Sequence, residues 1–138
     1  MLETESMSFL KHAGRIVRIN VQLNLLLRIR QRLQHSNMPG RNFLQQCLRS
    51  AIHFLSGCDI SIGAIVPTST RFPHPTGIVI GDGVRLGERV TIYQNVTLGS
   101  HGRPGAMPTY PIVDDDCTLF AGCVLIGDIT LGKGAIVG

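Results

Sequence analysis

Residues 80–99 read IGDGVRLGERVTIYQNVTLG, in which an Ile or Leu stands at every sixth position. The spacing returns after residue 112 and continues to the end of the chain. Ile, Leu and Val make up 39 of the 138 residues, so nine matches in nine positions are far more than chance would give. A period of six fits neither an α-helix nor a half-buried strand. It is typical of a hexapeptide β-helix, and the nine corner positions are Ile80, Leu86, Ile92, Leu98, Val113, Leu119, Leu125, Leu131 and Val137.

A second apolar position, four residues after each corner, supports this interpretation. Three six-residue segments make one triangular coil, so residues eighteen apart stack and both apolar positions face a narrow core. Glycine often follows the corner, where a Cβ would crowd the backbone bend. Carried backward through Ile62 and Thr68, the register places His74 at a corner, where an apolar residue would otherwise stand. The fourth-place residues are Val84, Val90, Val96, Cys117, Cys123, Ile129 and Ala135.

The chain divides into two parts of different charge and composition. Residues 1–56 hold eight Lys or Arg against two Glu, a balance of +6, whereas residues 57–138 hold five against seven acidic residues, a balance of −2. Fourteen of the sixteen Gly lie after residue 56, as a coil rich in corners requires. We therefore predict an α-helical N-terminal region over 1–56, with helices over 9–35 and 41–55, and a β-helix domain over 57–138.

Several classes of protein are disfavoured by the N-terminal part. The apolar cluster within residues 23–29 is far shorter than the roughly 20 residues needed to cross a membrane. No charged start with an apolar core and a small-residue cleavage site opens the chain, so we expect a cytoplasmic protein. The basic helices are compatible with contact to an anionic membrane surface, with a packing or oligomerisation face as the alternative. Few aromatic residues and no recognition motif speak against nucleic-acid binding.

Neither the cysteines nor the acidic run indicates a metal site. The four cysteines lack the short paired spacing of zinc sites, and a cytoplasmic chain is not expected to form disulfides. Cys117 and Cys123 fall on core positions and are interpreted as small buried hydrophobic residues. The acidic run 114–116 is expected to form a solvated turn, because three consecutive side chains in a coil cannot all point the same way. We predict no bound metal.

One aspartate and one histidine stand at a spacing with chemical consequences. Asp59 precedes His74 by fifteen residues, three short of one coil, so we expect the two side chains on adjacent layers. A carboxylate bonded to one ring nitrogen fixes the histidine tautomer and leaves the other nitrogen to accept a hydroxyl proton. The pair therefore suggests a general base with its orienting partner, and a structural histidine is the alternative.

Two stretches carry a family resemblance: HPTGIVIG at 74–81 and VTIYQNVTLG at 90–99. With GDITLG at 127–132, they resemble the serine O-acetyltransferase family of hexapeptide-repeat acyltransferases, including exopolysaccharide-associated relatives, over residues 57–138. The specific part of the match is the His-x-x-Gly-Ile-Val motif at the same distance from an upstream Asp. The resemblance implies a left-handed parallel β-helix that assembles as a homotrimer and transfers acetyl from acetyl-CoA to a hydroxyl group.

The resemblance also implies roles for individual residues. His74 matches the catalytic base of the family and Asp59 its partner, and backbone N–H groups would stabilise the oxyanion. Acetyl-CoA would lie in a groove between neighbouring coils of two subunits. The residues expected near its pantetheine arm are Gly99, Ser100, Ala121 and Gly122.

The six-residue register breaks between Leu98 and Val113, where fifteen residues separate two corners. We expect an extruded loop there, because the Gly and Pro of residues 100–105 suit a projecting turn. Arg103 is a candidate to bind a CoA phosphate, with a solvated loop charge as the alternative. His101 is the rival base, since other hexapeptide acetyltransferases use a loop histidine.

Two departures from the family bear on the acceptor. Serine acetyltransferases typically have an Asp directly before the base and an Arg-His pair before a loop Pro, which grip the charged ends of the amino acid. This chain has Pro73 and Thr109-Tyr110 at these places. A buried charge without a partner is costly, so serine would need substitute partners. L-Serine, in cysteine biosynthesis, and a sugar hydroxyl, in exopolysaccharide synthesis, both stay open as acceptors, and Tyr110 is expected to stack on a sugar ring.

The end of the chain leaves a second class of function open. Gly138 follows a corner by one residue, where family members continue with further coils. We therefore expect a truncated C-terminus or a reduced relative, and the short helical region favours a trimer over a hexamer. A non-catalytic trimeric β-helix scaffold is the alternative to an enzyme. A γ-carbonic anhydrase would need three metal-binding histidines, and only His74 and His101 lie within the repeats.

Overall fold

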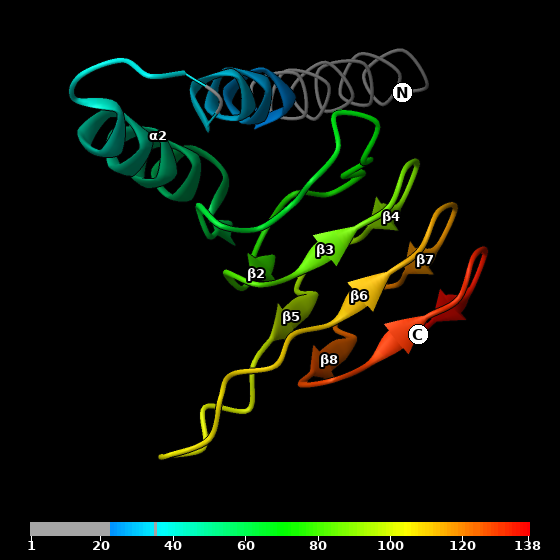
Figure 1. Cartoon of the computed structure of the whole chain (residues 1–138). Coiled ribbons are helices and arrows are strands. Elements are labelled where there is room, and N and C mark those ends of the chain that lie inside the picture. Colours follow the sequence, from blue (N-terminus) through cyan, green and yellow to red (C-terminus); the bar gives the residue numbers. More distant parts are fainter. Residues whose placement is uncertain (1–22, 35) are drawn as a thin grey trace, which may run out of the picture.

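The helical region precedes the strands, as Figure 1 shows for the computed structural model, which describes residues 23–34 and 36–138. Residues 23–34 are helical, and α2 follows over Arg41–Ser56. The N–H of Gly57 ends α2 by donating to the carbonyl of His53 at 2.8 Å. Its φ of 66° is left-handed, a conformation that glycine adopts without steric cost. Helices thus occur over the described parts of both predicted ranges, 9–35 and 41–55. The part of the first predicted helix over 9–22, and residue 35, lie outside the described residues.

Ten short strands follow in the described chain, and all of their pairings are parallel. From β2 onward, successive strands pass in rotation through three sheets, of order β1-β2-β5-β8, β3-β6-β9 and β4-β7-β10. Figure 1 shows the strands of each sheet one below another. The strands are β1 (Asp59–Ile60), β2 (Val79–Ile80), β3 (Arg85–Leu86), β4 (Thr91–Ile92), β5 (Thr97–Gly99), β6 (Ile112–Val113), β7 (Thr118–Leu119), β8 (Val124–Ile126), β9 (Thr130–Leu131) and β10 (Ile136–Val137).

The chain therefore winds as a three-sided parallel coil, and the six-residue period determines what its core contains. Ile80 pairs with Leu98, eighteen residues later, and Val113 with Leu131 at the same separation. Seven of the nine predicted corner side chains are buried, and Leu131 and Val137 pack partly buried against them. The fourth-place residues follow the same pattern, with Ile129 and Ala135 partly buried and the others buried. Both apolar positions thus face the core, as the sequence predicted.

The acidic run forms the solvated turn that we expected. Asp114 and Asp116 are exposed, and Asp116 turns with a φ of 62°. Its carboxylate accepts two hydrogen bonds from Arg89 of the neighbouring coil, at 2.6 and 2.8 Å. These bonds hold the pKa of Asp116 below its usual value and raise the pKa of Arg89. The run therefore joins two coils at a corner and faces water.

The register predicted for the first coil was wrong by two residues. Ile60 pairs with Ile80, a separation of twenty residues, and the same shift places Arg71 opposite Thr91. The corners of the first coil are therefore not Ile62, Thr68 and His74. The buried residues that occupy these corners are Ile60, Val66 and Phe72.

The two extra residues fall in the turn between Phe72 and Ile78, and His74 is exposed there. Prolines on both sides of His74 explain the bulge. A proline has no N–H to donate to the neighbouring coil, so this turn cannot take the regular pairing. The sequence period could not show this, because it extends a register without detecting an insertion.

Helix 23–34 covers the open edge of the first coil. Leu23 and Leu27 are buried on its inner face, and three polar side chains of the same helix donate to carbonyl groups of the coil. An edge strand leaves such carbonyls unpaired, so these donors replace a missing coil. Burial lowers the pKa of the Arg30 guanidinium. The three pairs are Arg30 Nη1 to Ile60 O at 2.7 Å, Gln31 Nε2 to Val66 O, and Gln34 Nε2 to Ile62 O.

The corrected register makes opposite predictions for two neighbouring side chains. Phe72→Ala removes a buried corner ring, so the free energy of unfolding should fall by about 3–5 kcal/mol. His74→Ala removes an exposed side chain, so the change should stay within about 0.5 kcal/mol. Urea unfolding at one fixed protein concentration measures both. A larger loss for His74→Ala than for Phe72→Ala would restore the original register.

Candidate functional site

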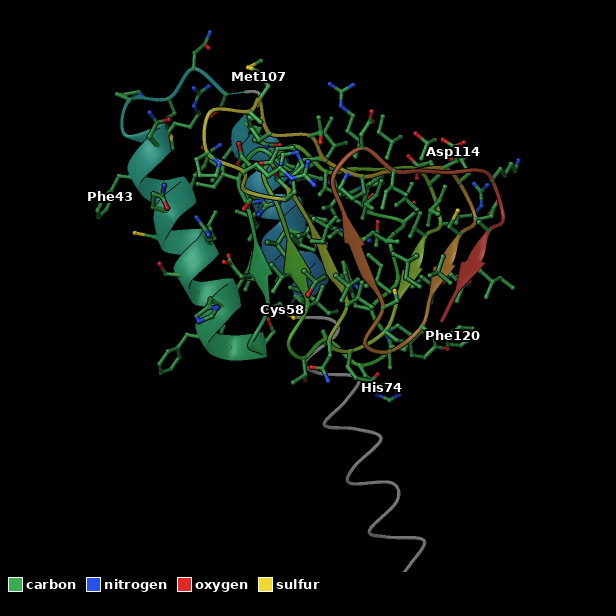
Figure 2. The ribbon with its side chains drawn as sticks, turned by 90° about the horizontal axis from the view of Figure 1, so that it is seen from below. Phe43, Cys58, His74, Met107, Asp114 and Phe120 are labelled. Atoms are coloured by element: carbon green, nitrogen blue, oxygen red, sulfur yellow. The ribbon has the colours of Figure 1, made fainter. Side chains whose placement is uncertain are left out.

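His74 lies exposed at one edge of the coil, where the chain enters strand β2. Its carbonyl accepts the N–H of Thr76 at 2.9 Å. Its ring centroid lies 6.2 Å from that of Tyr93, and the Tyr93 ring stacks on Phe120 at 5.2 Å. Figure 2 shows His74 and Phe120 along the same side of the molecule. Two aromatic rings, Tyr93 and then Phe120, therefore extend in a row from the predicted base, and the sequence analysis singled out neither of them.

Asp59 begins β1, and its carboxylate is held by a residue that the sequence did not single out. Arg49 of α2 donates to both oxygens, through Nε at 3.0 Å and Nη2 at 3.1 Å. The two side chains remain 37% and 39% exposed. No hydrogen bond joins the carboxylate to His74, although the structure describes both residues. In this structure Asp59 is therefore paired with α2 and not with His74.

Backbone hydrogen bonds show which segments lie beside each other near Asp59. The N–H of Asp59 donates to the carbonyl of Ile78 at 2.8 Å, and the N–H of Gly77 donates to the carbonyl of Gly57 at 3.1 Å. The segment that carries Asp59 therefore runs beside the one that follows His74. The expectation that the side chains of Asp59 and His74 lie on adjacent layers stays a prediction.

A cavity of about 440 Å³ lies between α2 and β1, around the Arg49–Asp59 pair. Such a volume suits a small molecule. It combines one cation and one anion, which pair with each other, with neutral hydrogen-bonding groups and the ring of Phe54. The residues that line it are Gln46, Arg49, Ser50, His53, Phe54 and Asp59.

The predicted loop connects β5 to β6 and projects from the coil, as the yellow segment of Figure 1 shows. Thr97 pairs with Val124, twenty-seven residues later, so the loop adds nine residues to a regular coil. His101 and Arg103 are both exposed on it. The N–H of Arg103 donates to Nδ1 of His101 at 3.1 Å, which leaves Nε2 of that ring free of this contact.

The residues expected along CoA divide between the two ends of the parallel strands of one sheet. We call the side where these strands begin the first edge and the side where they end the second edge. Because β2, β5 and β8 are parallel, the residues before each strand share one edge and the residues after each strand share the other. Ala121 and Gly122 precede β8, at the edge that carries His74, and the N–H of Gly122 donates to the Gln94 carbonyl at 3.0 Å. At the opposite edge lie Gly99, Ser100, Arg103 and Tyr110. One chain therefore does not bring the whole predicted set together.

One polar atom at the second edge has no partner in the chain. The hydroxyl of Ser100 is buried and makes no hydrogen bond within the described structure. Buried hydroxyl groups usually have a partner. Arg30 Nε, Thr70 Oγ1 and Gln94 Oε1 are in the same state among the described residues. The place expected for Ser100 beside the pantetheine arm stays a prediction.

Tyr110 packs against the coil. A Cβ built on Gly83 would lie 2.2 Å from Cδ2 of the ring, and one built on Gly81 would lie 3.0 Å from Cε1. The ring is half-buried against the core. It therefore fixes the return of the loop to the coil, and the two glycines make room for it.

Thiol and metal chemistry find no support in the described residues. Burial raises the pKa of the Cys123 thiol, so that thiol is protonated at neutral pH. Cys117 is buried as well, in agreement with the predicted core role. Within residues 23–34 and 36–138, no group of three or more His, Cys, Asp or Glu is placed to hold a metal ion.

No family model matches the chain. Two curated relatives are the plasmid serine acetyltransferase of Synechococcus elongatus, 36% identical over 119 residues, and the serine acetyltransferase of Bacillus licheniformis, 33% identical over 98 residues. These alignments cover 80% and 71% of this chain. The chain belongs to the serine acetyltransferase family. It spans 36% and 45% of the length of these two relatives, which is less than half of each.

Solved structures agree with this membership. A truncated serine acetyltransferase apoenzyme matches 86% of this chain with a TM-score of 0.75 and 30% identity, over 48% of its own length. The serine acetyltransferase of Neisseria gonorrhoeae in complex with serine matches 85% of this chain with a TM-score of 0.68 and 28% identity, over 45% of its own length. A serine acetyltransferase in complex with CoA matches 89% of this chain with a TM-score of 0.63 and 27% identity, over 46% of its own length. The sequence-based recognition of the family is confirmed.

The packing of Tyr110 on the glycines can be tested by a double-mutant cycle. Gly83→Ala should lower the free energy of unfolding by about 1–3 kcal/mol, because the new methyl group overlaps the ring. In a Tyr110→Ala background the same substitution should cost much less, since the ring is gone. Urea unfolding of the four proteins measures the coupling. Equal costs in both backgrounds would show that the ring does not rest on Gly83.

Proposed function

We propose that this protein transfers the acetyl group of acetyl-CoA to a hydroxyl group, with His74 as the general base. Membership in the serine acetyltransferase family carries the proposal. One structural relative was solved with CoA and another with serine. The exposed position of His74 supports the role, because a base at the surface of the coil is open to an acceptor.

The proposed acetyl transfer needs one general base and one set of hydrogen-bond donors. His74 removes the hydroxyl proton as the acceptor oxygen attacks the thioester carbonyl. Backbone N–H groups stabilise the oxyanion that forms. The C–S bond then breaks, and the proton passes from the imidazolium to the departing thiolate of CoA. The proposed steps use no metal.

The division of the CoA residues supports a homotrimer with shared sites. Ala121 and Gly122 lie at the edge of His74, whereas Gly99, Ser100 and Arg103 lie at the opposite edge of the same sheet. We propose a groove that joins the first edge of one subunit to the second edge of the next and so uses both sets. We propose this arrangement, with the left-handed winding and cytoplasmic location expected from the sequence.

Asp59 is proposed as the partner of His74, as in the family pattern. In the structure its carboxylate is bound to Arg49, so orientation of His74 requires the carboxylate to move or to be shared. A half-exposed ion pair is weak, on the order of 0–1 kcal/mol, so this exchange is accessible.

L-Serine is the first acceptor that we propose, which would place the protein in cysteine biosynthesis. The charged grips expected for serine are replaced here by Pro73 and Thr109-Tyr110, and we propose Arg49, in the cavity beside Asp59, as the cation that receives the serine carboxylate. A sugar hydroxyl, in exopolysaccharide synthesis, is the second acceptor. It is favoured by the same replacements, and Tyr110 remains the residue proposed to contact it.

The base can be identified by thiol release. With acetyl-CoA and the active acceptor, chosen from L-serine and a panel of sugars, His74→Ala should lower kcat by about a hundred- to ten-thousand-fold. His101→Ala is the matched control, since His101 is the other exposed histidine of the coil region, and it should keep most of the activity. Loss of activity in His101→Ala alone would identify His101 of the loop as the base. Absence of acceptor-dependent release in the unmodified protein would favour the non-catalytic trimeric scaffold.

A further inference from the structure

Arg49 holds the acid that is proposed to orient the base. Its Nε and Nη2 donate to the two carboxylate oxygens of Asp59 at 3.0 and 3.1 Å. A two-point pair of this kind fixes a carboxylate in both position and direction. The ring of His74 contacts the Tyr93 ring and forms no hydrogen bond within residues 23–34 and 36–138. The structure thus pairs the acid with α2 and gives the base no orienting hydrogen bond.

A second cation lies close to the Arg49–Asp59 pair. Arg30 is 1% exposed, and its Nη1 donates to the carbonyl of Ile60 and not to a carboxylate. Burial, and after it the positive charge of Arg49, lowers the pKa of Arg30. The described ion pairs give these two cations a single carboxylate, that of Asp59. Departure of Asp59 would leave both cations without an anion, so another anion must take its place.

An acceptor that carries a carboxylate can supply this anion. The cavity of about 440 Å³ is lined by both Arg49 and Asp59 and has room for a small amino acid. The two side chains are 37% and 39% exposed, so their ion pair is weak and an incoming carboxylate competes with Asp59 for the guanidinium. The N–H of Asp59 donates to the carbonyl of Ile78, so a released carboxylate stays on the segment beside the one that follows His74.

We propose that Arg49 is a positioning residue that couples acceptor binding to the general base. The acceptor carboxylate replaces the Asp59 carboxylate on Arg49, and Asp59 then accepts a hydrogen bond from the ring of His74. This bond fixes one tautomer of the ring, whose other nitrogen accepts the hydroxyl proton.

The coupling rests on the proposed acetyl transfer and on Arg49 as the cation that receives the acceptor carboxylate. It goes further by making the release of Asp59 depend on that carboxylate. The acceptor class is therefore a hydroxyl compound with a carboxylate group, since a neutral sugar leaves Asp59 on Arg49 and His74 without its partner.

Two acceptors and one substitution test the coupling by kinetics. L-Serinamide has an amide in place of the carboxylate, so in the unmodified protein its kcat should be about tenfold or more below that of L-serine. Arg49→Gln should raise the KM for L-serine about tenfold or more, because a charge-assisted contact is lost. It should also raise kcat with L-serinamide, because Asp59 is no longer held. Arg32→Gln is the matched control, since it removes an exposed arginine of helix 23–34 and should change neither value.

Nitrogen-15 NMR of the His74 ring tests the exchange without acetyl-CoA. L-Alanine has the carboxylate but no hydroxyl group, so it binds without reacting. Its addition to the unmodified protein should shift the neutral ring from a mixture of tautomers to one tautomer, because the released Asp59 accepts from one nitrogen. Asp59→Asn should abolish this shift. The main comparison uses the unmodified protein, so it does not depend on the folding of any variant.

The two measurements separate failure of the coupling from failure of the proposed function. Equal kcat values for L-serine and L-serinamide, or a His74 ring that L-alanine leaves unchanged, would overturn the coupling. Activity with neutral sugars alone would overturn it too, as would loss of kcat with both acceptors in Arg49→Gln, which indicates a structural role. A tautomer shift without any acetyl transfer would support the exchange and contradict the proposed function.

Discussion

Hydrogen bonding between successive coils is the constraint on which the other features depend. The N–H of Val79 donates to the Val96 carbonyl, and the N–H of Thr97 donates to the Cys123 carbonyl, in the same direction along the stack. Each coil must therefore match the one before it. Residues beyond the regular number cannot enter the short strands, so they are expelled at corners. The six-residue repeat is interrupted at two places, by two extra residues around His74 and by nine extra residues in the loop. Both places carry candidate functional side chains.

The first coil poses a different problem, because no earlier coil pairs with it. Helix 23–34 solves it with side-chain donors, and α2 is attached through the Arg49–Asp59 pair. The helical region thus binds the coil both through these polar groups and through Leu23, Leu27 and Ile52, which are buried in its core. Of the apolar residues of α2, Ile52 is buried, whereas Phe43, Phe54 and Leu55 remain exposed. The Arg49–Asp59 pair also ties the acid proposed as partner of His74 to the helical region, so that the position of α2 bears on the proposed chemistry.

Two edges of one sheet organise the proposed function. The edge before the strands carries His74 and the ring row, whereas the edge after them carries Ser100, with its buried unpaired hydroxyl, and the projecting loop. Within one chain, these two groups lie at opposite ends of the same parallel strands. The division agrees with a site formed between subunits, and it follows from parallel strands, whose beginnings all share one edge.

The sequence by itself determined the core, the coil, the loop and the family. Each of these depends on a short-range pattern: an apolar side chain at every sixth position must face inward, and a broken count must leave a loop. Only the tertiary structure decided the register of the first coil, the pairing of Asp59 with Arg49 and the packing of Tyr110 on Gly83. The two-residue insertion is invisible to a period that is still satisfied by chance at Ile62. The partner of a half-exposed carboxylate depends on how a helix lies against a coil, and no local pattern encodes that.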